Sequence, residues 1–314
     1  MNGKFIISLD FELHWGIADI CALDGKKEYF DATRESIPKV LSLFEKYGIH
    51  ATWASVGFLF AHDKEQLLDF SRIERPNYEN QVLSNYSIFD TVGADEKSDP
   101  YHFAPSFIQK IIDTPNQELG SHTFSHYYCN ESGQTAAQFE ADLKSAQEIA
   151  KQNFGVEMRS LVFPRNQINA DYLSILAEKG FRTARSNPKQ WFWKGNALHM
   201  RLARLLDTLL PIGNPPAFES EVVDGVLLLP ANRFLRPINA NEKLLQPLKW
   251  NRIKSEMKYA AKHKRAYHLW WHPHNFGYFT NENMAYLEKI LNYYSELNKK
   301  YGFESASMIE MLKP

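Results

Sequence analysis

The chain has 314 residues, of which 44% are hydrophobic and 23% are charged, and its formal net charge is −1. This length suits an α/β barrel and is enough to bury a large core. The near-neutral charge gives no indication of a nucleic-acid partner or of an acidic disordered tail.

The cysteines and the apolar runs indicate which cellular compartment to expect. Cys21 and Cys129 lie far apart and form no CxxC pair, which argues against a disulfide framework and against a cysteine zinc site. The apolar run near the N-terminus is too short for a signal peptide, and no stretch reaches the roughly 20 apolar residues of a membrane span. We therefore expect a cytoplasmic protein without a membrane span, acting on an intracellular intermediate.

The chain opens with a strand, a helix and a second strand. Residues 4–9 form an apolar run that predicts a buried strand. Residues 31–47 place apolar side chains at helical spacing, and Gly48 ends the helix. Residues 50–56 read as the next strand. Strand–helix–strand order is typical of a parallel sheet.

The alternation continues through the chain with two interruptions. Residues from about 62 to 117 form a Pro-rich, polar insertion, expected to carry a short helix or two over one end of the barrel, and residues 191–218 look irregular. Further strands are expected at 118–121, 161–163, 181–184, 226–229 and 266–271, and helices at 135–154, 170–179, 252–263 and 281–301, before a last short strand and helix. With no linker or repeat, residues 1–314 are interpreted as one domain.

Polar side chains gather where the predicted strands end. Asp10 and Glu12 follow the first strand, and His122 and His126 follow a middle strand. A later strand is followed by Arg165, and a still later one by His272 and His274, so the set is Asp10, Glu12, His122, His126, Arg165, His272 and His274. The carboxyl ends of parallel barrel strands meet at one mouth, where barrel active sites lie. We therefore expect these residues to meet there.

The histidine pair indicates a metal site. The i, i+4 spacing of His122 and His126 predicts that both imidazoles share one face of a helical turn. Two imidazole nitrogens and one carboxylate oxygen, with a position left for water, are typical of hydrolytic zinc sites. Asp10 and Glu12 supply that oxygen and a spare carboxylate. Each pattern is common alone, and the combination carries the prediction.

The chain resembles the polysaccharide deacetylase family, the carbohydrate esterases with the NodB homology domain. His122-Thr123-Phe124-Ser125-His126 matches the family's His-(Ser/Thr)-x-x-His motif in full, and Ser8-Leu9-Asp10-Phe11-Glu12 is similar to its acidic first motif. The segments 50–57, 163–166 and 269–273 resemble the Ala-Thr-Phe-Phe strand, the arginine–proline motif and the late histidine motif. We find no counterpart of the fourth motif.

This resemblance implies a distorted (β/α) barrel, with inserted segments over the active-site mouth, and a role for each residue. Glu12, His122 and His126 would hold a divalent metal, most simply Zn²⁺, and Asp10 would be the general base. Arg165 would orient Asp10 and keep it ionised, and His272 would protonate the leaving amine. Expected substrate contacts come from His14, Trp15 and His274.

Several alternatives stay open from sequence. Either acidic residue of the first motif can be the metal ligand, and either late histidine can be the acid. The favoured function is metal-dependent N-deacetylation of an amino sugar, as a small molecule, an oligosaccharide, or a nucleotide- or lipid-linked intermediate of surface polysaccharide synthesis. The first alternative is an allantoinase-like hydrolase of a small or cyclic amide. The second is a non-catalytic carbohydrate-binding protein. The sequence leaves the oligomeric state open.

Overall fold

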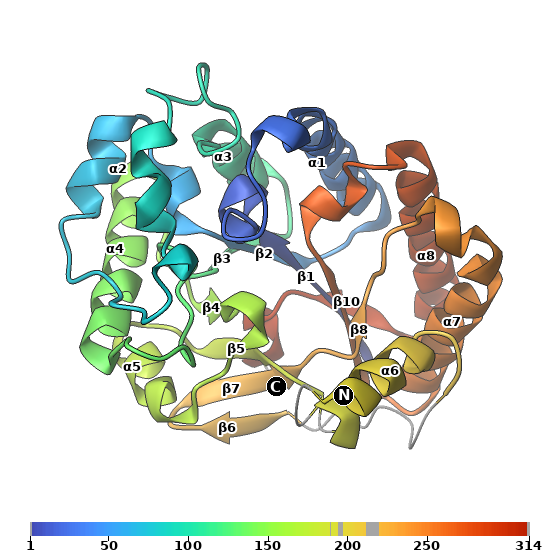
Figure 1. Cartoon of the computed structure of the whole chain (residues 1–314). Coiled ribbons are helices and arrows are strands. Elements are labelled where there is room, and N and C mark those ends of the chain that lie inside the picture. The colour runs from blue at the N-terminus through green and yellow to red at the C-terminus, as the bar shows by residue number, and fades with distance from the viewer. Residues whose placement is uncertain (1, 189, 194–196, 212–219, 313–314) are drawn as a thin grey trace.

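The computed structural model describes residues 2–188, 190–193, 197–211 and 220–312. Strands occupy the centre of the molecule and helices surround them, with α2, α4 and α5 on one side and α7 and α8 on the other (Figure 1). The strands form one curled sheet. The predicted α/β fold of distorted-barrel type is therefore confirmed.

The sheet contains ten strands in the order β6-β7-β5-β4-β3-β2-β1-β9-β8, with β10 pairing with β1. Among these pairs only β6–β7 is antiparallel. Their bounds are β1 (Lys4–Phe11), β2 (Ala51–Ser55), β3 (Gln117–Ser121), β4 (Ser160–Leu161), β5 (Thr183–Ser186), β6 (Glu221–Val223), β7 (Val226–Pro230), β8 (Arg233–Phe234), β9 (Ala266–Trp271) and β10 (Glu304–Ala306). Within the described residues no ladder joins β7 to β8, so the barrel stays open there.

The helices fill the crossovers between parallel strands. They are α1 (Lys27–Tyr47), α2 (Lys64–Phe70), α3 (Pro105–Asp113), α4 (Ala136–Phe154), α5 (Leu173–Glu178), α6 (Leu198–Asp207), α7 (Gln246–Lys262) and α8 (Thr280–Tyr301). Gly48 and Gly155 end α1 and α4 in the left-handed conformation, with φ of 60° and 67°. None of the helices in the described part of the chain is both long and apolar enough to cross a bilayer.

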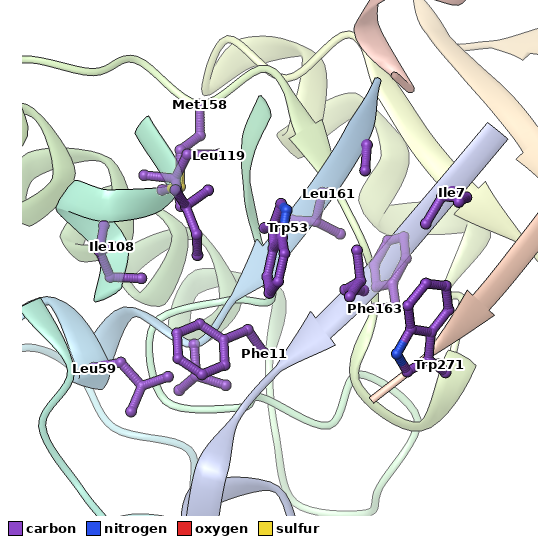
Figure 2. Close-up of a cluster of buried hydrophobic side chains, with 14 of the residues drawn as sticks. Ile7, Phe11, Trp53, Leu59, Ile108, Leu119, Met158, Leu161, Phe163 and Trp271 are labelled. Atoms are coloured by element: carbon purple, nitrogen blue, oxygen red, sulfur yellow. The ribbon is translucent and has the colours of Figure 1, made fainter. Parts of the chain in front are cut away.

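The period-two alternation of β1 separates the core from the chemistry. Phe5, Ile7, Leu9 and Phe11 belong to the main hydrophobic cluster. Successive strand residues point to opposite faces, so Ser8 and Asp10 share the other face. Figure 2 shows Phe11, Trp53 and Trp271 within the main cluster. The ring centroid of Phe44 on α1 lies 6.2 Å from those of Trp53 and Trp271, so this core fills the layer between sheet and helix.

The two stretches predicted to interrupt the strand–helix alternation contain more regular structure than expected. The stretch 62–117 contains α2 and α3, but α3 is the ordinary crossover helix between β2 and β3 rather than part of an insertion. The extra segment before it is fastened to the loops at the mouth: the Asn85 side chain donates to the carbonyl oxygens of Trp15 and Ser125. The stretch 191–218, expected to be irregular, contains α6, and its residues 194–196 and 212–218 lie outside the described part.

Candidate active site

Two buried carboxylates stand at the end of β1. Asp10 is on the strand and Glu12 directly follows it, and both side chains are almost completely removed from solvent. The neighbours β2 and β9 pair with β1 along this end, which fixes the backbone that carries them. An unpaired buried carboxylate is costly, so each of these acids requires a positive partner.

The partner of Asp10 is Arg185 on β5. Its two terminal nitrogens donate to both carboxylate oxygens at 2.6 and 2.7 Å, a two-pronged ion pair. The guanidinium also donates to Asn166 Oδ1 and lies 4.1 Å from the Trp270 ring centroid. Burial raises the pKa of Asp10, but Arg185, followed by His122 and His272, lowers it below its ordinary value overall. Asp10 is therefore held as a carboxylate.

The prediction that Arg165 orients Asp10 is wrong. The Arg165 side chain instead donates to Asp19 and stacks over Tyr128, at 4.5 Å from the ring centroid. Its backbone lies in the left-handed region, with φ of 52°, so the turn after β4 directs the side chain to the rim. Arg185 was missed, although it directly follows the predicted strand 181–184 and so carries the same strand-end signal as Asp10.

His122 and His126 bracket Glu12. The Nε2 atoms of His122 and His126 lie 3.0 and 3.2 Å from Glu12 Oε1. The segment joining them is a loop and not the predicted helical turn, because Thr123 and His126 have φ of 64° and 61°. The spacing therefore brought the two imidazoles together as predicted, but through two left-handed residues.

A buried acid on α4 shapes this loop. Asp142 accepts hydrogen bonds from the backbone N–H groups of Phe124 and Ser125, at 2.6 and 3.0 Å, and from the Ser125 hydroxyl. Burial raises the pKa of Asp142 to about 6, and the three donors oppose that rise. These bonds replace the hydrogen bonds that a helical turn would have made. Asp142 thus fixes the geometry of both imidazoles from outside the site.

The donor set fits a metal ion. His122 Nδ1 lies 2.8 Å from the carbonyl oxygen of Val162, which can only accept, so Nδ1 carries the proton. In the neutral ring, the Nε2 lone pair then faces the Glu12 carboxylate, an unfavourable arrangement that a cation between them relieves. Burial lowers the pKa of His126, which favours its neutral, metal-binding form. Glu12, His122 and His126 offer ligand atoms within 4.8 Å of one another, as do Asp10, Glu12 and His272.

Of the two late histidines, His272 is the more accessible. Its Nε2 atom lies 3.6 Å from Asp10 Oδ2 and 3.7 Å from Glu12 Oε1, and 24% of its side chain is exposed. His274 is buried, stacks on His272 and has Nδ1 3.8 Å from Glu12 Oε2. Burial, with a contribution from His272, lowers the pKa of His274 to about 3. The structure thus places both histidines at the site, as predicted.

His14 and Trp15 do not line the mouth. Both ring nitrogens of His14 are engaged, Nδ1 with His102 at 2.9 Å and Nε2 with the Cys21 carbonyl at 3.0 Å. Trp15 is fully buried, and its indole N–H donates to the His102 carbonyl. The predicted substrate contacts of these two residues are wrong, because the segment between β2 and α3 covers them.

Comparison with known proteins decides the family. The sequence model described as Polysaccharide deacetylase matches residues 27–184, half of the chain. The chain belongs to the polysaccharide deacetylase family. The matched span contains His122 and His126 but ends one residue before Arg185, and it begins after Glu12. No protein of curated function matches the sequence.

Solved structures share the fold of this family member at low identity. A protein assigned as a polysaccharide deacetylase from Mycobacterium smegmatis has a TM-score of 0.59 at 12% identity, over 99% of this chain and 90% of that one. The 4-alpha-glucanotransferase of Thermococcus litoralis gives 0.56 at 10%, over 99% and 40%. Puue allantoinase gives 0.53 at 11%, over 96% and 87%. These similarities show the fold.

Replacement of Asp142 by Asn should weaken metal binding. An amide presents NH₂ to one of the loop's N–H donors, so the loop that carries His122 and His126 loses its fixed shape. We expect the affinity for Zn²⁺ to fall about tenfold or more, as for other residues that support metal ligands. Chelator competition measures this, and Glu148→Gln, on the exposed side of the same helix, is the control. Equal affinity of Asp142→Asn and wild type would contradict the role.

Acid should destabilise the protein through His268 on β9. This histidine is fully buried, with Nε2 2.8 Å from Ser8 Oγ. Burial, with a contribution from Arg185, lowers its pKa from 6.5 to about 3. The unfolded chain therefore binds the proton first, and the stability present above pH 6.5 is lost as the pH falls toward 3, by about 1.4 kcal/mol per unit.

Urea unfolding across this pH range tests the expectation. His268→Gln should show a shallower loss of unfolding free energy with acid than wild type, whatever its stability at neutral pH. His263→Gln, which alters an exposed histidine at the end of α7, should keep the wild-type slope. If His268→Gln and wild type have the same slope, His268 does not carry the acid sensitivity.

Proposed function

We propose that this protein is a metal-dependent deacetylase that hydrolyses the amide bond of an N-acetylated amino sugar. The observation that carries the proposal is the pair of buried carboxylates with different partners. Asp10 is paired with Arg185, whereas Glu12 faces the nitrogen atoms of His122 and His126. One acid is thereby suited to proton transfer and the other to holding a cation.

Three residues are proposed to bind the metal, and one to act as the base. Glu12, His122 and His126 would hold the metal, and their nitrogen and oxygen donors suit Zn²⁺. Bound there, a divalent cation supplies a Lewis acid for the acetyl carbonyl and makes a water molecule more acidic. Each oxygen of Asp10 accepts one bond from Arg185 and keeps a second lone pair, with which the carboxylate accepts a proton from water. These contacts support Asp10 as the base and Glu12 as the metal-binding acid.

His272 is proposed to protonate the leaving amine. It is the more exposed of the two late histidines and lies close to both carboxylates. An amine leaves poorly unless protonated, so amide hydrolysis needs an acid at this point. His274 would contact the substrate or orient His272, against which its ring stacks at 4.8 Å.

The substrate class is part of the proposal. We propose an intracellular amino-sugar intermediate of surface polysaccharide synthesis, presented as an oligosaccharide or as a nucleotide- or lipid-linked sugar. Membership of the polysaccharide deacetylase family supports a carbohydrate substrate.

The decisive experiment combines metal analysis with a substrate panel. The purified protein should contain a divalent metal by elemental analysis, lose activity on chelation and regain it with Zn²⁺. Acetate release would be assayed on N-acetyl sugar nucleotides, N-acetyl oligosaccharides and a small cyclic amide. Asp10→Asn should bind metal but lose activity by about 10²-fold or more. A folded protein that binds no metal, or an active Asp10→Asn variant, would overturn the proposal.

A comparison of two arginines tests the ion-pair assignment. Arg185→Lys keeps the charge but loses the two-pronged geometry on Asp10, so we expect kcat to fall about tenfold or more. Arg165→Lys, at the rim, should retain kcat within about a factor of three, since the Arg165 side chain contacts Asp19 and not Asp10. Steady-state kinetics on the best substrate measures both. The reverse order of effects would restore Arg165 as the residue that orients Asp10.

A further inference from the structure

Helix α6 presents its leucines to solvent. Leu198, Leu202, Leu205, Leu206 and Leu210, on the helix and just after it, recur at the spacing of one helical face. Their exposed fractions are 72%, 52%, 43%, 48% and 55%. The buried residues of the helix are Ala203 and Asp207, one small and one charged. The apolar face of this amphipathic helix therefore points away from the protein.

Ion pairs hold the helix in this orientation. Asp207 Oδ2 lies 2.9 Å from Arg233 on β8, and Asp207 Oδ1 lies 2.9 Å from Arg252 on α7. Arg204 donates to the Phe192 carbonyl and lies 5.4 Å from the Trp193 ring centroid. Rotation that buried the leucines would expose Asp207 and leave two buried arginines without this partner. The outward apolar face is thus enforced by the polar contacts beneath it.

The flanking residues match the surface of a lipid bilayer. Trp191 precedes the helix and is 50% exposed, and Trp is enriched at membrane interfaces. The exposed charged residue of the helix is Arg201, and the one acidic side chain of α6 is the buried Asp207. Helices that lie in the interface of anionic membranes combine leucine and tryptophan with basic residues. Helix α6 adds one exposed arginine to its leucines and, within the helix, has no exposed acid.

A second copy of the chain fits this face less well. The helix has ten residues, fewer than three turns, which is a short seam for helix pairing. A symmetric contact would also bring the exposed Arg201 of both copies onto one interface, where like charges repel. An anionic lipid surface attracts the same charge.

We propose that α6, with Trp191, docks this protein on the surface of an anionic bilayer. The helix follows β5, the strand that carries Arg185, along the chain. Asp207 at its end pairs with Arg233 on β8, and the next residue, Phe234, lies 5.9 Å from His272 between ring centroids, so docking would bring the site close to molecules held at the membrane. Resting on the proposed function, we infer an acetylated amino sugar attached to a membrane lipid as the substrate.

Vesicle sedimentation of the full-length protein tests the docking. We expect binding to vesicles of mixed phosphatidylcholine and phosphatidylglycerol, weaker binding to phosphatidylcholine alone, and loss of affinity with added salt. Leu202→Glu/Leu206→Glu should weaken binding about tenfold or more, because two leucines that would be buried in the bilayer are lost and two negative charges are gained. The matched control is Leu68→Glu/Leu244→Glu. It makes the same two changes at exposed leucines elsewhere, one on α2 and one in the segment before α7.

Each outcome decides the proposal. Absence of vesicle binding by wild type, or equal binding by both double variants, would overturn it. Light scattering that shows a wild-type dimer and a monomeric Leu202→Glu/Leu206→Glu variant would assign the face to a second copy instead. Zn²⁺ affinity and acetate release from a soluble sugar should be unchanged in this variant, so failure of docking and failure of the proposed function are told apart.

Discussion

The neutralisation of two buried carboxylates is the constraint on which the site depends. Asp10 and Glu12 lie at the end of a buried strand, where neither can remain charged without a partner. Arg185 arrives from β5 and the imidazoles from the loop after β3, so strands distant in sequence must end at one mouth. A parallel curled sheet provides that convergence.

The imidazoles illustrate how the support of a site reaches beyond it. Nothing in the spacing of His122 and His126 requires a loop, and a helical turn would satisfy the same pattern. The loop is selected because Asp142, buried on α4, offers acceptors to Phe124 and Ser125. Directing both rings at Glu12 places Thr123 and His126 in the strained left-handed backbone conformation. The hydrogen bonds to Asp142 offset that strain.

Strand-end reasoning from the sequence predicted the curled α/β fold and brought the two acids, His122, His126 and His272 to one place. It failed where backbone direction decides the outcome. Arg165 follows β4, but its left-handed backbone conformation directs the side chain to the rim. No local sequence pattern predicts that turn. The predictions for His14 and Trp15 failed for another reason. Both residues are buried by contacts with residues about 70 to 90 positions away, and such contacts leave no periodic pattern in the sequence.

The proposed docking face and the site are connected through β8. Arg233 on this two-residue strand pairs with Asp207 beneath α6, and the next residue, Phe234, lies 5.9 Å from His272 between ring centroids. The strand is also paired in register with β9, which leads directly to His272. A helix held by Asp207 thus shares its support with the proposed acid.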